Sequence, residues 1–375
     1  MNILRTLALP LALGGCLAIN SCARSHASNH LDPASLLGLA RSYSRQDQPP
    51  ATIATSSPAQ KPADNSAARL QGEQEYRNQI MEYLAERNFT QLESAAREAR
   101  AGKGRVVGGL WKLFVFYEVV TKPVVDSDTE DAWMLQFDTL KQWISVWPAS
   151  ATARIAMAGT YENFAYHARG TGYATSVSDT GWQLYGQRIA LEAEYLAEAS
   201  RLKDKDPFWF EAMQHVALAQ GWDKSQAKEL TDLAYAFEPE FYHYYREYAN
   251  FLLPKWYGEE GEAEAFAEEI SKRLGGKQGA FVYFEIASVV TCQCDSEDTD
   301  MERLSWPKIK EGYEALGQLY GYSYLKVNRF AHMAFEARDR AAGQQAFALI
   351  KDNWDPSVWR TSERFESAKQ WAMAE

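Results

Sequence analysis

The sequence predicts an all-α protein, built as an array of antiparallel helix pairs behind a disordered N-terminal segment. Residues 191–210 and 229–242 read as two copies of one unit. In each copy, a helix rich in small residues runs into an acid–proline pair, and aromatic residues then open the next helix. The two prolines, Pro207 and Pro239, are about 32 residues apart, close to the period of tetratricopeptide repeats. Such a unit cannot bury its apolar face alone, so we expect the pairs to stack as a tetratricopeptide-like α-solenoid.

Residues 1–22 are predicted to be an export signal peptide. Arg5 supplies a positive charge, and an apolar stretch follows over residues 7–19, interrupted by Pro10. This stretch is too short and too broken to span a membrane. We therefore expect the chain to be exported.

Two cysteines in this segment, Cys16 and Cys22, each follow the aliphatic and small residues of a bacterial lipobox. Cleavage before Cys16 would leave apolar residues at the mature N-terminus, whereas cleavage before Cys22 leaves polar chain. We therefore predict lipidation of Cys22, in a lipoprotein that faces the periplasm or the cell exterior. The alternative is ordinary cleavage after Ala27, which would give a soluble periplasmic or secreted protein.

Residues 23–69 are predicted to form a disordered tether. They are rich in Ser, Ala, Pro, Gln and Asn, and they carry too few apolar side chains to offset the entropy cost of ordering. Residues 33–43 form one short amphipathic stretch, which we expect to be helical only transiently. The anchor and the tether would hold the folded region away from the membrane.

Residues 70–375 are predicted to fold as one helical-repeat domain without a hairpin. Apolar side chains recur at helical spacing from its start, beginning with Tyr76, Ile80 and Leu84. Residues 108–120 are aromatic and β-branched enough to suit a strand. Their large apolar side chains still fall at helical spacing, so we interpret this stretch as a buried helix.

Polar residues and prolines indicate where the following helices begin and end. Acidic residues at 128–131 suit the positive end of a helix dipole, and Pro148 ends that helix. Ser178 or Asp179 is expected to cap a long helix that runs to Leu202. Further helices are expected at residues 89–100, 150–168, 207–222, 225–237, 239–253, 261–274, 279–291, 324–338, 342–350 and 363–373.

The charge of the chain argues against several classes of partner. The formal net charge is −11, and no basic stripe is present to neutralise phosphates, so nucleic-acid binding is not expected. The same charge opposes electrostatic binding to anionic lipid. We therefore expect contact with a membrane through the lipid anchor only.

Three segments resemble the bacterial domain of unknown function 4034 family. They are residues 169–182 (RGTGYATSVSDTGW), 241–262 and 328–359. The likeness extends over about residues 84–371. That family is predicted to be tetratricopeptide-like and mostly exported, so the resemblance implies a helical-repeat fold and export. It implies no activity, because the family has no assigned reaction.

Cys292 and Cys294 are separated by one residue and followed by an acidic run. They would supply two ligands of a metal site, but a zinc site needs four and no histidine is nearby. In an oxidising compartment we expect the two thiols to form a disulfide with each other. A thiol or metal protein that uses this pair is one alternative function.

No catalytic residue, cofactor site or metal site is predicted. His167, His215, His243 and His332 each stand alone within a helical pattern, and no H-E-x-x-H or G-x-S-x-G motif is present. Residues 169–172 resemble an anion-binding loop, but a helix C-cap explains them better.

Aromatic side chains with a few arginines remain as candidates for a functional surface. Repeat arrays hold peptides and other extended ligands on a concave face. We therefore expect a non-catalytic envelope protein that binds a protein, a peptide or another extended ligand in a groove. The expected groove residues are Arg169, Trp182, Arg188, Tyr245, Arg246 and Trp256. A second alternative is an envelope hydrolase whose site assembles only in three dimensions.

Overall fold

The computed structural model describes residues 31–45, 66–125, 127–170, 172, 174–291 and 300–374. Within these ranges the chain forms 17 α-helices and no β-strand, so the predicted all-α class is confirmed. The extended contact recorded there is an isolated bridge between Arg105 and Trp111. None of the described helices combines the length and the apolar character needed to cross a membrane.

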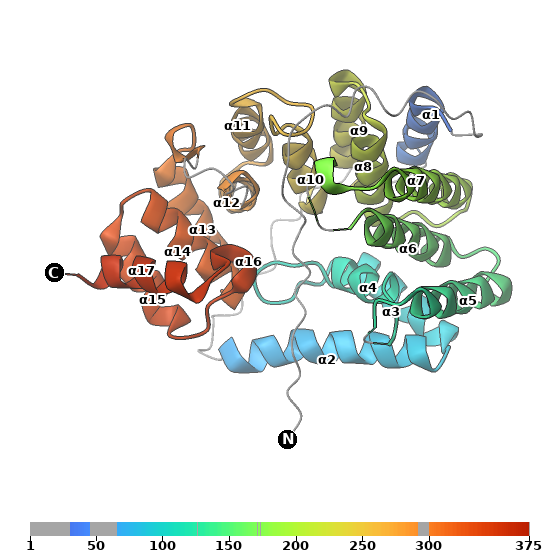
Figure 1. Cartoon of the computed structure of the whole chain (residues 1–375), viewed down its shortest axis with the longest axis horizontal. Helices are drawn as coiled ribbons and strands as arrows, with labels where there is room; N and C mark the ends of the chain where they lie inside the picture. Colours follow the sequence, from blue (N-terminus) through green and yellow to red (C-terminus); the bar gives the residue numbers. More distant parts are fainter. Residues whose placement is uncertain are drawn as a thin grey trace.

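Helices α3 to α9 gather on the right of Figure 1 and α11 to α17 on the left, with α10 between them. The first group and its neighbours are α1 (Pro33–Ser44), α2 (Ser66–Ala85), α3 (Phe89–Gly102), α4 (Lys112–Val120), α5 (Glu130–Val146), α6 (Ala151–Arg169), α7 (Asp179–Ser200), α8 (Phe208–Gln220) and α9 (Lys224–Phe237). The remainder are α10 (His243–Phe251), α11 (Glu262–Leu274), α12 (Gly276–Thr291), α13 (Trp306–Tyr320), α14 (Tyr324–Glu336), α15 (Arg340–Ile350), α16 (Pro356–Trp359) and α17 (Ser362–Met373).

Many helices that follow one another in the chain pack against each other. The most extensive contacts join α6 with α7, α11 with α12, α12 with α13, and α14 with α15. The helices joined by the two acid–proline pairs, α7 with α8 and α9 with α10, also contact each other, but less extensively. The stacking of all pairs into a tetratricopeptide-like solenoid stays a prediction.

Side-chain caps set the ends of the helices that later carry the candidate site. Ser150 accepts a hydrogen bond from the backbone N–H of Ala153 at 2.9 Å and begins α6. Ser178 accepts from the N–H of Gly181 at 3.1 Å and begins α7, as the sequence indicated. Each cap satisfies a backbone donor that a helix start leaves free. Gly170, with a φ of +74°, ends α6 as the predicted C-cap.

A glycine loop before α4 brings the two halves of the chain together. Helix α4 begins at Lys112, later than expected, because Gly108 and Gly109 have φ values of +83° and +82°. A Cβ atom at Gly108 would lie 2.5 Å from the hydroxyl oxygen of Ser323. A Cβ atom at Gly109 would lie 2.9 Å from the ring of Tyr320. The loop therefore fits closely against the segment between α13 and α14.

The first helix corrects the predicted tether. The expectation that residues 23–69 are disordered is wrong for α1, which packs against α7, α8 and α9. Tyr43 of α1 stacks on Trp209 with ring centroids 4.3 Å apart, and Arg41 pairs with Glu229. Its other buried side chains are Leu36, Leu37 and Ala40. Helix α1 is therefore part of the folded domain, because burial of its apolar face offsets the entropy cost of ordering it.

The first acid–proline pair forms a junction in the core. Asp206 is fully buried and accepts hydrogen bonds from Arg100 Nη1 and from the Tyr117 hydroxyl, both at 2.7 Å. Its backbone N–H donates to the hydroxyl of Tyr43 at 2.7 Å. Asp206 thus joins α1, α3 and α4 at a point two residues before α8 begins.

Candidate metal centre

The structure separates the six residues that were expected to line one groove. Tyr245 is fully buried and its hydroxyl donates to the carbonyl of Pro239 at 2.8 Å, so the expectation that it faces a ligand is wrong. Arg246 pairs with the buried carboxylate of Glu285 at 2.9 Å. Trp256 is half-buried against the hydrophobic core. These three side chains therefore serve packing and charge pairing within the domain.

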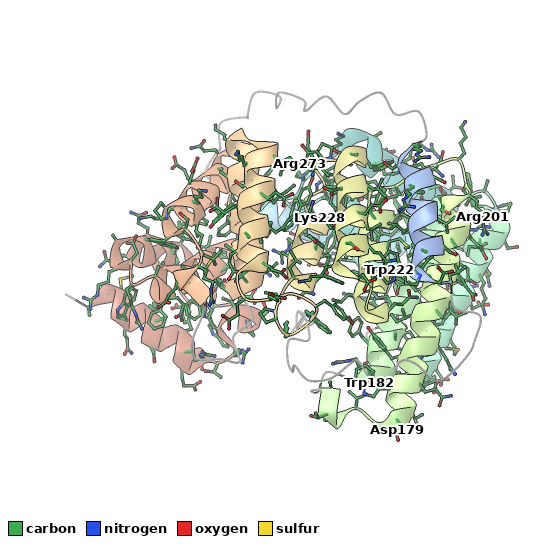
Figure 2. All side chains as sticks on the ribbon, turned by 90° about the horizontal axis from the view of Figure 1, so that it is seen from above. Asp179, Trp182, Arg201, Trp222, Lys228 and Arg273 are labelled. Carbon is green, nitrogen blue, oxygen red and sulfur yellow. The ribbon has the colours of Figure 1, made fainter. Side chains whose placement is uncertain are left out.

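Two of the six residues do come together. Arg169 at the end of α6 lies over the ring of Trp182 near the start of α7, 5.3 Å from its centroid, and both are partly exposed. Figure 2 shows Trp182 and Asp179 at one end of α7. Arg188, further along α7, is buried over the ring of Phe164 at 3.2 Å. A surface pair of Arg169 and Trp182 is what remains of the expected groove.

The predicted sites at the cysteines lie outside the described residues. These are the lipidation site at Cys22, its alternative Cys16, and the pair Cys292 and Cys294. Lipidation and the disulfide therefore stay predictions.

A different group of side chains forms the candidate site, where α6, α7, α8 and α10 place four glutamates around one histidine. The members of this Glu/His cluster are Glu162 on α6, Glu192 on α7, Glu211 and His215 on α8, and Glu247 on α10. Glu211 and His215 are one helical turn apart, so they share a face of α8. Helix α8 contacts each of the other three helices, which brings the five side chains together.

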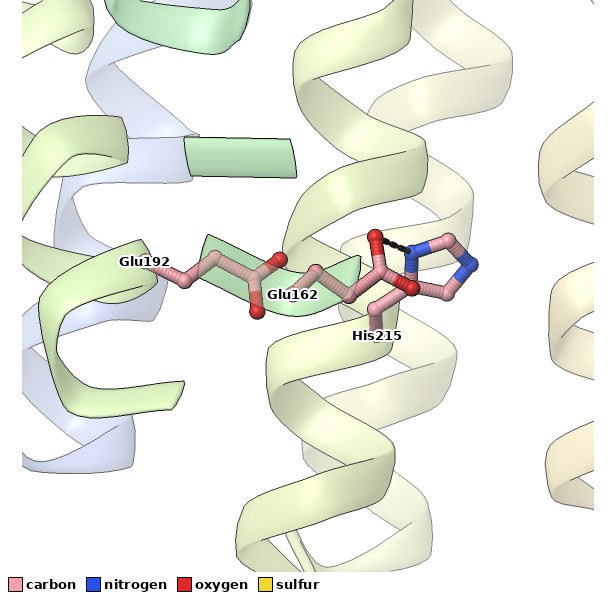
Figure 3. Close-up of side chains that lie close together, drawn as sticks. All are labelled: Glu162, Glu192 and His215. Carbon is pink, nitrogen blue, oxygen red and sulfur yellow. Dashed lines mark ion pairs between the residues drawn. The ribbon is translucent and has the colours of Figure 1, made fainter. Parts of the chain in front are cut away.

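His215 lies at the centre of the Glu/His cluster. Its Nδ1 atom is 2.9 Å from Glu162 Oε2 (Figure 3), and its Nε2 atom is 3.3 Å from Glu247 Oε2. Two sets of three ligand atoms share the imidazole, one with Glu162 and Glu192, the other with Glu211 and Glu247. Within each set the atoms lie within 4.8 Å of one another. The two ring nitrogens therefore contact different carboxylates on either side.

The cluster has a buried part and a part that reaches solvent. Glu192 is 0% exposed and Glu211 is 3% exposed. Within the described part of the chain, both carboxylate oxygens of Glu192 and the Oε2 atom of Glu211 have no hydrogen-bond partner. The side chains of Glu162, His215 and Glu247 are between 16% and 22% exposed. A buried charge without a partner is costly, so the two buried carboxylates require either protons or a cation.

The pKa values of the cluster follow from this arrangement. Burial, and then the charge of Glu162, raises the pKa of Glu192 well above its ordinary value. Burial also raises the pKa of Glu211 well above its ordinary value. Burial alone would lower the pKa of His215, but Glu162 and Glu247 outweigh it and hold that pKa well above the usual range. Without a metal ion, burial therefore favours the protonated forms of Glu192 and Glu211, and the neighbouring carboxylates favour the protonated form of His215.

Two tyrosines connect the Glu/His cluster with the surface pair of Arg169 and Trp182. The hydroxyls of Tyr166 and Tyr185 are hydrogen-bonded to each other, and their ring centroids are 5.5 Å apart. The carboxylate of Glu162 acts electrostatically on Tyr166. Tyr185 packs edge-on against Trp182 with centroids 5.8 Å apart. An aromatic path therefore runs from the cluster to the exposed pair.

Glutamates and one imidazole are ligands that suit Mn²⁺, Fe²⁺ or Zn²⁺. One nitrogen of His215 would bind the ion, while the other would keep its carboxylate contact. Metal-binding histidines are commonly oriented by a carboxylate in this way. For an ion on the Glu162 and Glu192 side, Glu247 would hold the second nitrogen. Three protein ligands would leave coordination positions for water or for another molecule.

Comparisons with protein-family models, with curated proteins and with solved structures find no match to this chain. The resemblance to the domain of unknown function 4034 family therefore stays a prediction. The candidate centre depends on the geometry of this chain alone.

By its sequence pattern alone, His215 is a lone helical histidine, and no metal site is predicted there. The structure corrects that interpretation of His215, since four helices supply its carboxylate neighbours. One signal was present in the helical pattern. Glu192 follows Ile189 by three residues and precedes Leu196 by four, and both apolar residues are buried, so a carboxylate occupies the apolar face of α7. Glu211 and His215 give a second signal, but spacing within one helix does not tell which helices meet.

Proposed function

We propose that this chain binds a divalent transition-metal ion, such as Mn²⁺, Fe²⁺ or Zn²⁺, in the Glu/His cluster. The observation that carries the proposal is the burial of Glu192 without a hydrogen-bond partner. Its side chain is fully buried, and both of its carboxylate oxygens lack a partner within the described part of the chain. It also offers a ligand atom within 4.8 Å of ligand atoms from Glu162 and His215. A cation among these atoms supplies the missing partner.

The charge of the cluster supports the same function. Carboxylates buried for structural reasons are usually paired with a cation, as Asp206 is with Arg100 at 2.7 Å. In the described part of the chain, neither Glu192 nor Glu211 has an ion pair with lysine or arginine. Among the described side chains, His215 is the cation next to both glutamates, and Glu162 and Glu247 already contact its ring nitrogens. A metal ion would neutralise the site without requiring protons on buried glutamates.

We place the ion on the Nδ1 side of His215. The contact with Glu162 on that side is 2.9 Å, against 3.3 Å to Glu247 on the other. Glu192, whose two oxygens both lack partners, belongs to the same side, whereas Glu211 lacks a partner at one oxygen. Glu247 would then orient the imidazole through its contact with Nε2.

Ligand binding at the surface pair of Arg169 and Trp182 is a second proposed role. The observation that favours it is that both side chains are partly exposed and are linked to the cluster through Tyr185. This role retains the expected binding of an extended ligand. A metal ion with open coordination positions beside that surface would also suit the envelope hydrolase considered from the sequence. Export and lipidation at Cys22 remain part of the proposal, and they would place the centre in the cell envelope.

Calorimetric titration of the metal-free full chain with Mn²⁺ and with Zn²⁺ tests the metal proposal. We expect one ion per chain and a higher melting temperature in the presence of metal. Glu192→Gln should weaken binding at least about tenfold, because it removes a charged ligand. Glu198→Gln is the matched control: it lies on the same helix, but its carboxylate pairs with Arg154 at 3.1 Å. This control should bind metal like the wild type.

Two results would contradict this proposal in part or in whole. If Glu211→Gln abolishes binding and Glu192→Gln does not, the ion lies on the Nε2 side of His215, and the placement above is wrong. If the folded wild type binds neither ion stoichiometrically, the metal function itself is rejected.

A further inference from the structure

The Nε2 side of the His215 ring carries a second set of ligand atoms, which an ion on the Nδ1 side leaves unused. The set consists of Glu211 on α8, Glu247 on α10 and His215 itself, and its three ligand atoms lie within 4.8 Å of one another. Glu211 precedes His215 by one helical turn, and Glu247 Oε2 lies 3.3 Å from Nε2. The imidazole therefore has a pair of carboxylates on each of its two nitrogen sides.

Glu211 is the most enclosed member of this second set. Its side chain is 3% exposed, and its Oε2 atom has no hydrogen-bond partner within the described part of the chain. Apart from His215, the neighbours whose charges act on it most strongly are the carboxylates of Glu247, Glu162 and Glu118. A buried carboxylate in such surroundings needs a proton or a cation.

An ion on the Nδ1 side would not supply that cation. Its charge would be matched by Glu162 and Glu192, whereas Glu211 belongs to the opposite side of the ring. A ring nitrogen that binds a metal ion carries no proton, so His215 would change from a cation to a neutral group. Burial raises the pKa of Glu211, and the charge of His215 is the neighbouring influence that lowers it. The first ion therefore removes positive charge from the side on which Glu211 and Glu247 lie.

The ligands of the second set suit an ion that accepts nitrogen as well as oxygen. Zn²⁺ binds imidazole and carboxylate groups, and three protein ligands leave one position for water. Mn²⁺ prefers oxygen ligands and is less suited to this side. The side chains of His215 and Glu247 are 18% and 22% exposed, so this side of the ring is open to solvent.

We propose that the Nε2 side of the Glu/His cluster binds a second ion, Zn²⁺, through Glu211, Glu247 and His215, so that the imidazole bridges two metal ions. This inference rests on the metal function proposed above, because the first ion must occupy the Nδ1 side. When the second ion binds, the Nε2–H bond breaks, the proton passes to water, and the lone pair left on the nitrogen forms the bond to Zn²⁺. No electron is transferred. Glu247, which contacts Nε2 in the state with one ion, becomes a ligand of the second ion.

The two ions would connect different helices. The first joins α6, α7 and α8 through Glu162, Glu192 and His215, and the second joins α8 to α10 through Glu211 and Glu247. Each ion binds the folded chain and stabilises it. We therefore expect the melting temperature to rise a second time when the Nε2 side is filled.

Equilibrium dialysis of the metal-free full chain against rising concentrations of Zn²⁺, with elemental analysis of the protein, tests the proposal. We expect a tight step of one ion per chain, followed by a weaker step that brings the total to two. The second step is weaker because the first ion repels the second and because a ring proton must leave. With Mn²⁺ we expect the first step only.

Glu211→Gln should weaken the second step at least about tenfold and leave the first unchanged, because Glu211 is a ligand on the Nε2 side only. Glu118→Gln is the matched control: the charge of Glu118 acts on Glu211, but Glu118 pairs with Arg77 at 2.6 Å and belongs to neither set of ligand atoms. This control should bind two ions like the wild type. If Glu211→Gln fails to fold, Glu247→Gln replaces it as the test of the second step.

Nuclear magnetic resonance of isotope-labelled histidine tests the bridge itself. The Nε2 atom of His215 should carry a proton when one ion is bound and lose it when two are bound. If the folded wild type binds one Zn²⁺ and no second ion in excess metal, the second site is rejected while the first stands; if it binds none, both are rejected. The second site is also rejected if Glu211→Gln keeps the second step, or if Nε2 keeps its proton with two ions bound.

Discussion

Arg246 and Glu247, adjacent residues of α10, form ion pairs with different helices. Arg246 Nη1 lies 2.9 Å from Glu285 Oε2 on α12, and Glu247 Oε2 lies 3.3 Å from His215 Nε2 on α8. Consecutive side chains of an α-helix point about 100° apart, so a single turn serves both contacts. Burial raises the pKa of Glu247, but the hydrogen bond from His215 and the charge of Arg246 bring it below its ordinary value. The short helix α10 therefore joins the Glu/His cluster to α12.

Metal affinity should rise with pH. Protons on Glu192 and His215, whose pKa values are both raised, must leave before these groups can bind an ion. Titrations of the full chain with Mn²⁺ at about pH 6 and about pH 8 should show tighter binding at the higher pH. Calorimetry in two buffers of different ionisation enthalpy should detect proton release. An affinity that stays constant over this range would contradict the assignment of these groups as ligands.

Glu192→Gln should make the metal-free protein more stable at alkaline pH. The folded protein keeps a proton on Glu192 above the pKa of an unfolded glutamate, about 4.3, so wild-type stability falls as pH rises from there toward the raised value. A neutral glutamine removes this loss of stability. The loss is about 1 kcal/mol or more for each unit by which the pKa of Glu192 is raised. Urea unfolding at about pH 5 and about pH 8 measures the effect. A variant less stable than the wild type at the higher pH would show that the carboxylate has a structural partner.

Asp206→Asn should destabilise the protein by about 3–5 kcal/mol, because Arg100 would lose its buried partner. The Tyr117 hydroxyl, which donates to the same carboxylate, would also bind less strongly. Asp138→Asn is the control, since Asp138 pairs with Arg87 at 3.1 Å on the surface. That change should cost less than about 1 kcal/mol. Similar midpoints for the two variants in urea unfolding would refute the role of Asp206 as a junction.

Tyr43→Ala should lower stability by about 3–5 kcal/mol, because it removes a buried ring that stacks on Trp209 and accepts from the N–H of Asp206. Arg41→Ala, which breaks an exposed ion pair on the same helix, should cost less than about 1 kcal/mol. Thermal unfolding of the full chain compares the two. Equal melting temperatures for Tyr43→Ala and the wild type would mean that α1 does not contribute to the folded domain.

The elements of the fold were largely predictable because they depend on local signals. Ser178 caps α7 as expected, and Gly170 ends α6 as expected. Two errors have nonlocal causes. Helix α4 begins later than expected because the glycine loop before it packs against Ser323. Helix α1 is ordered because it packs against α7, α8 and α9. The amphipathic stretch at residues 33–43 and the two glycines are visible in the sequence, but the surfaces that they contact are not.

The candidate centre was not predictable for a related reason. Its five side chains come from four helices, and helical spacing relates only Glu211 to His215. The sequence also suggested that Arg188 and Arg246 face a ligand. In the structure, Arg188 lies over the ring of Phe164 and Arg246 pairs with Glu285, both inside the domain. A charged residue on an apolar helical face therefore predicts a buried partner, but the partner itself is known only once the helices are packed.

The contact of Gly108 with Ser323 and of Gly109 with Tyr320 has a consequence for cooperativity. In an open repeat array each unit touches only its neighbours, so the ends can unravel one unit at a time. Here the loop after α3 closes on the segment between α13 and α14, and melting of either half removes a surface on which the other packs. Unfolding would then proceed as one all-or-none transition, in which α2 and α15 lose their structure at the same denaturant concentration.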